Sequence, residues 1–311
     1  MSEEGLESRV HVAPTWRAFW PRRVGIVLLV SASGIALAGA LSLAMAFSGV
    51  NDRDWGTALG GAAMGLGMLL LSSTVFALAG IQPHRPWRKV KLIVDEHRGP
   101  GLQLRRRLTG LLLAAFLAMT VWAVVAVVVQ FRGTSESLLP SSRNNDEGGL
   151  VLLGMTVGSI AFIIFCLLQA RTEVSLSLHP GGVLRRARRR RLFRSESAEE
   201  FLRWEDVDEV KVDTHDVHTA YSTVNNPIIR LVSSSLDPSR KLKRFDTEDS
   251  MALRAYELGA EPNAIMALVL WCHENPWARE RLAREDARDL LHAPPLRERL
   301  RLSREAVKKP Q

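Results

Sequence analysis

The sequence has no charged residue over four long stretches, and this absence says most about the class of the protein. The stretches are Val24–Phe47, Gly56–Ile81, Leu108–Phe131 and Gly149–Leu168, of 24, 26, 24 and 20 residues. A helix of about 20 mostly apolar residues crosses the hydrocarbon core of a bilayer. Lipid offers no partner to the peptide groups, so a spanning segment must bond its own backbone as a helix. The sequence therefore predicts an α-helical transmembrane bundle of four spans.

The same absence argues against one class of function. Proton relays and ion pathways usually carry Asp, Glu, Lys, Arg or His at membrane depth. The polar side chains within these stretches are hydroxyls, such as Ser72, Thr120 and Thr156. A hydroxyl can bond the carbonyl four residues earlier and needs no substrate. A transporter coupled to protons or ions is therefore not expected, whereas a passive or lipid-facing role stays open.

Residues and motifs of catalytic or metal sites are also scarce. The two cysteines, Cys166 and Cys272, lie far apart and form no disulfide or zinc pattern. The chain has no glycine-rich phosphate loop, Gly-x-Ser-x-Gly elbow or His-Glu-x-x-His motif. Two His and two Asp gather within 213–218, where a strand is expected to run into a solvated loop. We expect no enzyme, no cofactor and no metal.

The excess of basic residues, with a formal net charge of +8, predicts the orientation of the spans. Lys and Arg are concentrated before the first stretch, between the second and third, and after the fourth; these segments are 9–23, 85–107 and 171–191. The two other connections carry few. Cytoplasmic loops are the ones enriched in Lys and Arg. We therefore expect a multi-pass protein of the inner (cell) membrane with both termini in the cytoplasm.

The first stretch could instead be a cleaved export signal. Arg22 and Arg23 precede it, and Ala44 and Ala46 stand near its end. The apolar region of a signal peptide runs only about 7–15 residues, however, so a retained anchor is favoured. Cleavage would leave three spans.

Glycine spacing indicates how the helices pack. Gly-x-x-x-Gly pairs clear one helix face for a close neighbour, and packing within the bundle is favoured over dimerisation. The pairs are Gly56/Gly60, Gly61/Gly65 and Gly154/Gly158. Tryptophans near span ends prefer the headgroup zone. Four are expected there: Trp16, Trp20, Trp55 and Trp87.

The second half of the chain reads as a folded α+β domain. Alternating apolar residues and turn signals predict strands. These are Thr172–His179, Val183–Phe193, Phe201–Trp204, Glu209–Asp213, Pro227–Val232 and Lys241–Phe245, with Met251–Leu258 either a strand or a short helix. Apolar spacing between two prolines predicts a helix over Pro262–Asn275. A charged amphipathic helix over Pro276–Leu291 and a polar tail follow.

Three short segments carry a resemblance to known proteins. Phe201–Val212, with its Trp204-Glu-Asp-Val turn, resembles the matching stretch of bacterial PH-like domains. Leu258–Ile265 and Trp271–Pro276 are similar to closing segments of actinobacterial integral membrane proteins with this layout. The resemblance covers about residues 172–282. It implies a PH-like barrel or bent antiparallel sheet with a C-terminal helix, acting as a binding module for lipids or proteins, and it transfers no functional residue.

A run of arginines in the second predicted strand allows two interpretations. If the preceding strand descends from the bilayer, the hairpin brings the run back to the leaflet, where each basic side chain near anionic lipid contributes roughly 1 kcal/mol. The run comprises Arg185, Arg186, Arg188, Arg189, Arg190 and Arg191. The other interpretation, slightly favoured, is a solvated patch that only sets topology. No nucleic-acid motif accompanies it, so nucleic acid is not expected as a partner.

Together these patterns predict the domain organisation. We expect a cytoplasmic segment at 1–23, a membrane domain at 24–170 with a basic loop at 82–107, a PH-like domain at 171–291, and a polar tail at 292–311. The expected function is an adaptor that tethers a protein- or lipid-binding module to the bilayer. Its partners would be a protein and, for the arginine run, anionic headgroups. The alternative is a small transporter or lipid-handling protein with a regulatory cytoplasmic domain.

Overall fold

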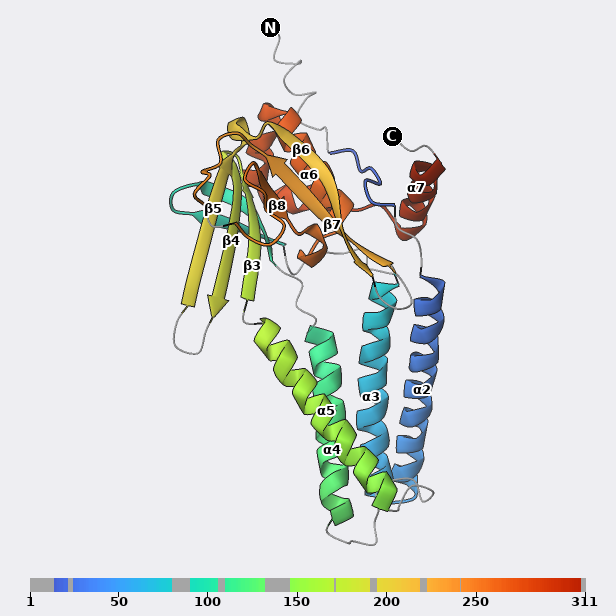
Figure 1. Cartoon of the computed structure of the whole chain (residues 1–311). Coiled ribbons are helices and arrows are strands. Elements are labelled where there is room, and N and C mark those ends of the chain that lie inside the picture. Colours follow the sequence, from blue (N-terminus) through green and yellow to red (C-terminus); the bar gives the residue numbers. More distant parts are fainter. Residues whose placement is uncertain are drawn as a thin grey trace. The chain divides into compact units, whose positions relative to one another are not determined.

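The chain folds into two compact units in a computed structural model (Figure 1). The helical unit comprises residues 24–82 and 108–171, and the β unit comprises residues 1–23, 83–107 and 172–311. The structure describes residues 14–21, 25–79, 90–105, 110–131, 146–170, 172–190, 195–218, 223–240 and 242–308. The connection between the second and third helices belongs to the β unit, whereas the sequence assigned it to the membrane domain.

All four apolar stretches form helices whose ends lie within a few residues of the predicted limits. They are α2 (Ile26–Asn51), α3 (Trp55–Leu78), α4 (Gly110–Phe131) and α5 (Asp146–Ala170). Two helices, Ile26–Asn51 and Thr57–Phe76, are long and apolar enough to cross a membrane. Shorter apolar helices cover 116–128 and 156–165.

A three-residue turn joins α2 to α3. Arg53 takes a left-handed conformation with φ of 58°. Asp54 then caps α3, because its carboxylate accepts hydrogen bonds from the Thr57 backbone N–H at 3.0 Å and from the Thr57 hydroxyl at 2.6 Å. Such a cap satisfies an N–H that the first helical turn leaves free. The turn therefore ends one helix and starts the next within three residues.

Small residues bring α2 and α3 into close antiparallel contact. A Cβ added at Gly65 would lie 2.8 Å from the Gly39 carbonyl oxygen, and one at Gly61 would lie 2.7 Å from the Ser42 carbonyl oxygen. Near the other end, the Ser72 hydroxyl donates to the Ala32 carbonyl at 2.8 Å. Gly61 and Gly65 therefore lack room for a side chain where the two helices meet.

The other predicted glycines differ from one another. Gly60 faces α4, where a Cβ would lie 2.5 Å from Nε1 of Trp122. Gly154 and Gly158 on α5 have no atom within 4 Å of an added Cβ, so the contact expected within the bundle is not found there among the described residues. The surroundings of Gly56 lie outside what the structure describes.

Hydroxyl groups within the helices mostly bond their own backbone, as expected. Ser42 donates to the Ala38 carbonyl at 2.9 Å and Thr120 to the Phe116 carbonyl at 2.7 Å. Each bond closes within one helical turn. These hydroxyls therefore need no ligand to satisfy them.

The β unit contains a five-stranded antiparallel sheet in the order β1-β2-β3-β4-β5. The strands are β1 (Val90–Asp95), β2 (Gly99–Arg105), β3 (Thr172–His179), β4 (Gly182–Arg190) and β5 (Ser195–Arg203). The first two form a hairpin that the sequence analysis did not predict. Pairing of β2 with β3 joins residues 102–105 to residues 175–178, across the whole α4–α5 insertion.

A three-stranded antiparallel sheet and several helices complete the β unit. They are β6 (Glu209–His218), β7 (Thr223–Val232), β8 (Ser250–Leu253), α6 (Pro262–Glu274), the 3-10 helices η4 (Pro276–Ala283) and η5 (Glu285–Leu291), and α7 (Leu296–Lys308). The strand predicted at Lys241–Phe245 is wrong, because residues 242–246 form coil and a turn. The polar tail contains α7.

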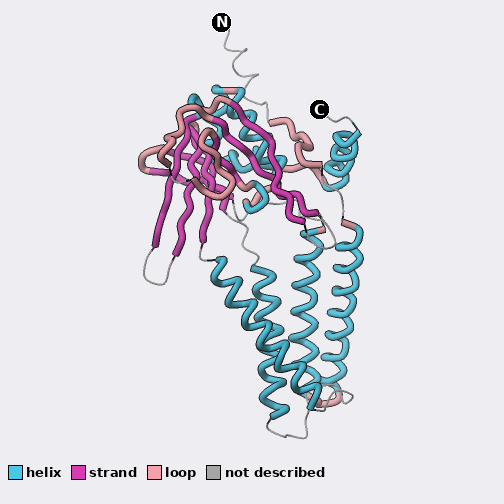
Figure 2. The backbone as a smooth tube through the Cα atoms, viewed as in Figure 1, coloured by secondary structure: helices cyan, strands magenta, loops and turns pink. Residues whose placement is uncertain are grey.

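One core unites both sheets with α6, and Figure 2 shows the strands and helices of this unit. Ten of the thirteen α6 residues are buried, including Ile265, Leu268 and Cys272. Leu178 from the first sheet and Leu231 from the second lie in the same apolar cluster. The helix predicted over Pro262–Asn275 thus lies at the centre of the core.

The N-terminal segment also belongs to this core, which corrects the headgroup placement of two tryptophans. Trp20 is 7% exposed; its backbone N–H donates to Oδ1 of Asn263 at 2.9 Å, and its indole donates to the Asp213 carbonyl at 3.0 Å. The Trp16 indole donates to Oε2 of Glu261 at 3.0 Å. Trp55 is 63% exposed, and Trp87 lies outside the described residues.

Replacing Gly65 by alanine tests the close contact of α2 and α3. We expect Gly65→Ala to lower the stability of the full-length protein by about 1–3 kcal/mol, the usual cost of overpacking. The control is Gly158→Ala, whose new methyl group meets nothing within 4 Å. Thermal unfolding in mild detergent measures both. Equal melting temperatures for the two variants would contradict the contact.

Candidate functional site

The register of β4 and β5 places two arginines opposite two glutamates. Arg185 pairs with Glu200, and Arg186 pairs with Glu199. Successive side chains of a strand point to opposite faces, so one ion pair lies on each face of the sheet. The Arg185–Glu200 pair and the Arg186–Glu199 pair therefore belong to two separate networks, one on each face of the sheet.

On one face, Arg186 takes part in a partly exposed network. Its Nε donates to Oε1 of Glu199 at 2.5 Å, and its Nη2 lies 3.5 Å from Oδ2 of Asp95. Asp95 also lies 3.6 Å from Arg98 in the first hairpin. The His97 backbone N–H lowers the pKa of Asp95, and Arg98 and Arg186 lower it further. This network fastens the unpredicted hairpin to β4.

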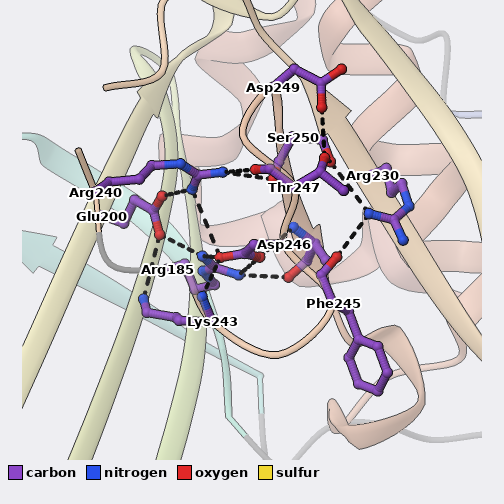
Figure 3. Close-up of polar contacts among 11 residues, drawn as sticks. Arg185, Glu200, Arg230, Arg240, Lys243, Phe245, Asp246, Thr247, Asp249 and Ser250 are labelled. Carbon is purple, nitrogen blue, oxygen red and sulfur yellow. Dashed lines mark hydrogen bonds and ion pairs between the residues drawn. The ribbon is translucent and has the colours of Figure 1, made fainter. Parts of the chain in front are cut away.

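On the other face, Arg185 is buried against Asp246 (Figure 3). Nη1 and Nη2 of Arg185 donate to Oδ1 and Oδ2 of Asp246 at 2.7 and 2.6 Å, which makes a bidentate pair. Nη1 also donates to the Ala252 carbonyl at 2.8 Å. A parallel pair of charge-assisted bonds fixes both distance and orientation.

Asp246 organises the loop that joins β7 to β8. Its side chain is fully buried and also accepts bonds from the backbone N–H groups of Lys243 and Ala252, both at 3.0 Å. Burial acts to raise the pKa of Asp246, but Arg185 and these two N–H groups outweigh burial and hold the pKa below its ordinary value. The carboxylate is therefore ionised at neutral pH.

Two further basic residues surround Glu200. Arg240 binds Glu200 and also donates through Nη2 to the carbonyls of Thr247 and Ser250, both at 2.7 Å. Lys243 lies farther away, with Nζ 3.5 Å from Oε2 of Glu200. Burial acts to raise the pKa of Glu200, but its basic neighbours lower it overall. We call Arg185, Glu200, Arg240, Lys243 and Asp246 the Arg185 cluster.

The Arg185 cluster holds three cations and two carboxylates, and the excess charge falls on Lys243. Burial is the largest influence on Lys243 and lowers its pKa, and the nearby Arg185 lowers it further. The pair that could neutralise Lys243 is long, and Glu200 is already bonded to Arg185 and Arg240. The cluster therefore carries one positive charge more than its own carboxylates balance.

A small cavity of about 50 Å³ opens beside the cluster. Its polar lining includes Arg185, Lys243, Arg244 and Arg254. The remaining lining is mainly apolar and comes from β3, β4, β8 and the segment after β8; it includes Val174, Leu176, Ala187, Leu253 and Leu258. Arginine and lysine thus line a pocket whose other walls offer little solvation.

A second ion pair fastens the same loop to the three-stranded sheet. Nε of Arg230 donates to Oδ2 of Asp213 at 2.7 Å, and Nη1 donates to the Phe245 carbonyl at 2.8 Å. The His215 ring lies 4.6 Å from the Phe245 ring. Within the described part of the chain, no three His, Cys, Asp or Glu residues gather as a possible metal site. Asp213 and His215 have structural neighbours instead.

Cys272 is buried in the core of the β unit. Burial raises the pKa of its thiol to about 12. The nucleophile of thiol chemistry is the thiolate, so this cysteine is unreactive near neutral pH. The side chain of Cys166 lies outside what the structure describes.

The arginine run predicted to face lipid divides into three groups. Arg185 is buried and Arg186 is bound by two carboxylates, so the prediction of a free basic surface is wrong for these two. Arg188 is exposed on β4. Arg191 and the side chains of Arg189 and Arg190 lie outside the described residues, so membrane contact there stays a prediction.

Sequence analysis missed Asp246, Arg240 and Lys243 as members of the site. Glu199 and Glu200 were not predicted as site residues either. One signal was available: Arg-Arg and Glu-Glu flank a hairpin at positions that become opposite in an antiparallel pair. The loop residues gave no comparable signal, because 61 positions separate Arg185 from Asp246.

Compared with protein-family models, curated protein sequences and solved structures, the chain shows no significant match. The interpretation of the site therefore rests on its own geometry.

Removing the charge of Asp246 tests the Arg185 cluster. We expect Asp246→Asn to destabilise the β unit by about 3 kcal/mol, because it removes the bidentate counter-ion of the buried Arg185 guanidinium and leaves only Glu200, which Arg240 shares. Asp237→Asn is the matched control, since Asp237 is exposed and its carboxylate bonds only Ser239 in the described part of the chain. Thermal unfolding followed by tryptophan fluorescence compares them. Equal melting temperatures for the two variants would show that the cluster does not stabilise the β unit.

Proposed function

We propose that the protein is a four-span membrane protein of adaptor type, whose β unit is a PH-like binding module held at the cytoplasmic face. The supporting observation is the way the chain alternates between its two units. It leaves the β unit after residue 21, forms α2 and α3, and returns at Val90. It leaves again after Arg105, forms α4 and α5, and returns at Thr172.

This alternation supports an even number of crossings for each helical pair. Both ends of the α2–α3 pair join the β unit, and so do both ends of the α4–α5 pair. A folded unit cannot lie on two sides of a bilayer. Each pair must therefore either cross twice or not cross at all, which agrees with the positive-inside pattern of the sequence.

The exposed surface of the helices supports crossing. Only 11% of the best apolar window of α2 and 22% of that of α3 is buried within the chain. Large apolar side chains are exposed on all four helices, including Val27, Leu59, Val121 and Val157. Soluble proteins rarely leave such extensive apolar surface in water. Lipid is the solvent that suits it.

The N-terminal anchor supports retention of the first span. Trp16 and Trp20 precede α2 and bond to residues at the start of α6. Cleavage after the first span would remove both tryptophans from the β unit. A retained first helix thus keeps the core of the module complete.

The chain passes repeatedly between the binding module and the membrane anchor. This arrangement suits a protein that tethers the module to the bilayer. The module cannot detach, so any partner that it binds meets it at a high effective concentration near the bilayer. One observation favours the alternative, a bundle that handles a small molecule or lipid. The Trp122 indole N–H is buried, and no acceptor for it is found among the described residues.

Cysteine labelling tests the four-span topology. In a Cys166→Ala background, Cys272 is buried and unreactive, so single reporters can be read separately. We expect Asp52→Cys and Ser142→Cys to react with a membrane-impermeant maleimide in intact cells in which the outer face of the cell membrane is accessible. The proposed topology places both loops on that outer face. Glu96→Cys, in the turn between β1 and β2, should react only after permeabilisation.

Two results would contradict the topology. Labelling of Asp52→Cys without Ser142→Cys would leave only the α2–α3 pair across the bilayer. Labelling of Glu96→Cys in intact cells would place the β unit outside.

Lysine cross-linking tests the adaptor proposal. All seven lysines lie in the ranges of the β unit, at positions 89, 91, 211, 241, 243, 308 and 309. An amine-reactive cross-linker applied in native nanodiscs therefore reports only on this unit. We expect one stoichiometric protein partner joined through these lysines, identified by mass spectrometry. Recovery of a bound lipid or small molecule without any cross-linked protein would favour the alternative.

A further inference from the structure

We propose that the cavity beside the Arg185 cluster binds a phosphate-type oxyanion, with Lys243 as its charged contact and the Nε–H of Arg185 as a buried donor. The proposal rests on the β unit being a binding module and names the chemistry of one ligand group that it takes. The oxyanion could belong to a lipid headgroup or to a soluble phosphorylated compound.

The charge of the site calls for an anion. The Arg185 cluster has one cation more than carboxylates, and Arg244 adds another at the same cavity. Arg254 adds none, because Nη1 bonds Oε1 of Glu257 at 2.8 Å. Attraction between charges strengthens as the local dielectric falls. An anion in this cavity, whose walls are mainly apolar, would therefore be held more strongly than one on an open surface.

Hydrogen-bond donors are free to receive that anion. The Nε of Arg185 is buried without an acceptor among the described residues, although both Nη atoms are bonded. An unpaired buried donor costs free energy that a bound oxygen would recover. The Nζ of Lys243 has only the long 3.5 Å contact with Glu200. The Arg244 guanidinium lies over the Phe245 ring, 4.9 Å from its centre, and is exposed.

The size of the cavity limits the ligand group. About 50 Å³ is room for more than one water molecule, which suits a compact tetrahedral oxyanion. The apolar walls contributed by Val174, Leu176 and Leu253 offer no partner to a polar sugar. Glu200 and Asp246 are not among the lining residues of this cavity, and they form ion pairs with Lys243 and Arg185, respectively. A single phosphate group therefore fits better than a large polar headgroup.

The connection between α5 and a strand that lines the cavity is short. Only three residues separate Ala170, the last residue of α5, from the lining residue Val174. Four peptide steps span at most about 14 Å when fully extended. If α5 crosses the bilayer, this short connection is compatible with a lipid phosphate as the source of the oxyanion.

The test uses full-length protein in nanodiscs and two probes. Inorganic phosphate is titrated in nanodiscs of phosphatidylcholine at constant ionic strength, and binding is followed by the thermal midpoint. Separately, native mass spectrometry counts lipids retained from a mixture of phosphatidic acid and phosphatidylcholine. The variant is Lys243→Gln. The control is Lys211→Gln, which removes the same charge from an exposed lysine on β6.

We expect phosphate to raise the midpoint of the wild-type protein and of Lys211→Gln. Lys243→Gln should bind phosphate about tenfold more weakly, the loss of one charge-assisted contact. Retention of phosphatidic acid that Lys243→Gln abolishes would identify the source as lipid. A phosphate effect without lipid enrichment would identify a soluble ligand. Arg244→Gln should show the same loss and serves if Lys243→Gln fails to fold.

Two outcomes would overturn the proposal: no response of the wild-type protein to either probe, or equal losses in Lys243→Gln and Lys211→Gln. Neither outcome touches the topology labelling or the lysine cross-linking, so failure of the oxyanion site is distinguishable from failure of the adaptor function.

Discussion

The pairing of β2 with β3 is the constraint on which the architecture depends. Backbone hydrogen bonds join residues 102–105 to residues 175–178, although the α4–α5 insertion separates them in sequence. The sheet can form only if the chain, after α4 and α5, comes back beside β2 as strand β3. This requirement closes the α4–α5 pair into a hairpin, and Trp20, bound to the start of α6, imposes the same return on α2 and α3. The helical and β units thus specify each other's connectivity.

The Arg185 cluster is a second constraint, and its main effect is to select one conformation of the loop between β7 and β8. Burying ions costs desolvation energy that a salt bridge only partly recovers. The bidentate Arg185–Asp246 pair nonetheless selects one conformation of the loop between β7 and β8, because Asp246 also binds two backbone N–H groups. That loop carries Lys243 to the cavity. A loop held less firmly would not keep an unbalanced cation beside apolar walls.

Local patterns were sufficient for part of the fold. The four helices, the β3–β4 hairpin and α6 follow from apolar periodicity and turn residues, which act over a few positions. The β1–β2 hairpin escaped prediction because it lies in a basic loop between two helices and pairs with a strand 70 residues later. Lys241–Phe245 looked like a strand, but burial of Asp246 and its bonds to the backbone favour a turn there.

The sequence by itself determined that this chain has four long helix-forming stretches without charge, basic segments around them, and an α+β domain after them. Those properties depend on residue type and short spacing, which survive any tertiary arrangement. Only the tertiary structure decided which charges are neutralised. Arg185 and Arg186 are alike in sequence, yet one meets buried Asp246 and the other meets partly exposed Glu199. Glu199 lies across the β4–β5 hairpin, but Asp246 is 61 positions from Arg185, and only folding brings so distant a residue within hydrogen-bond distance.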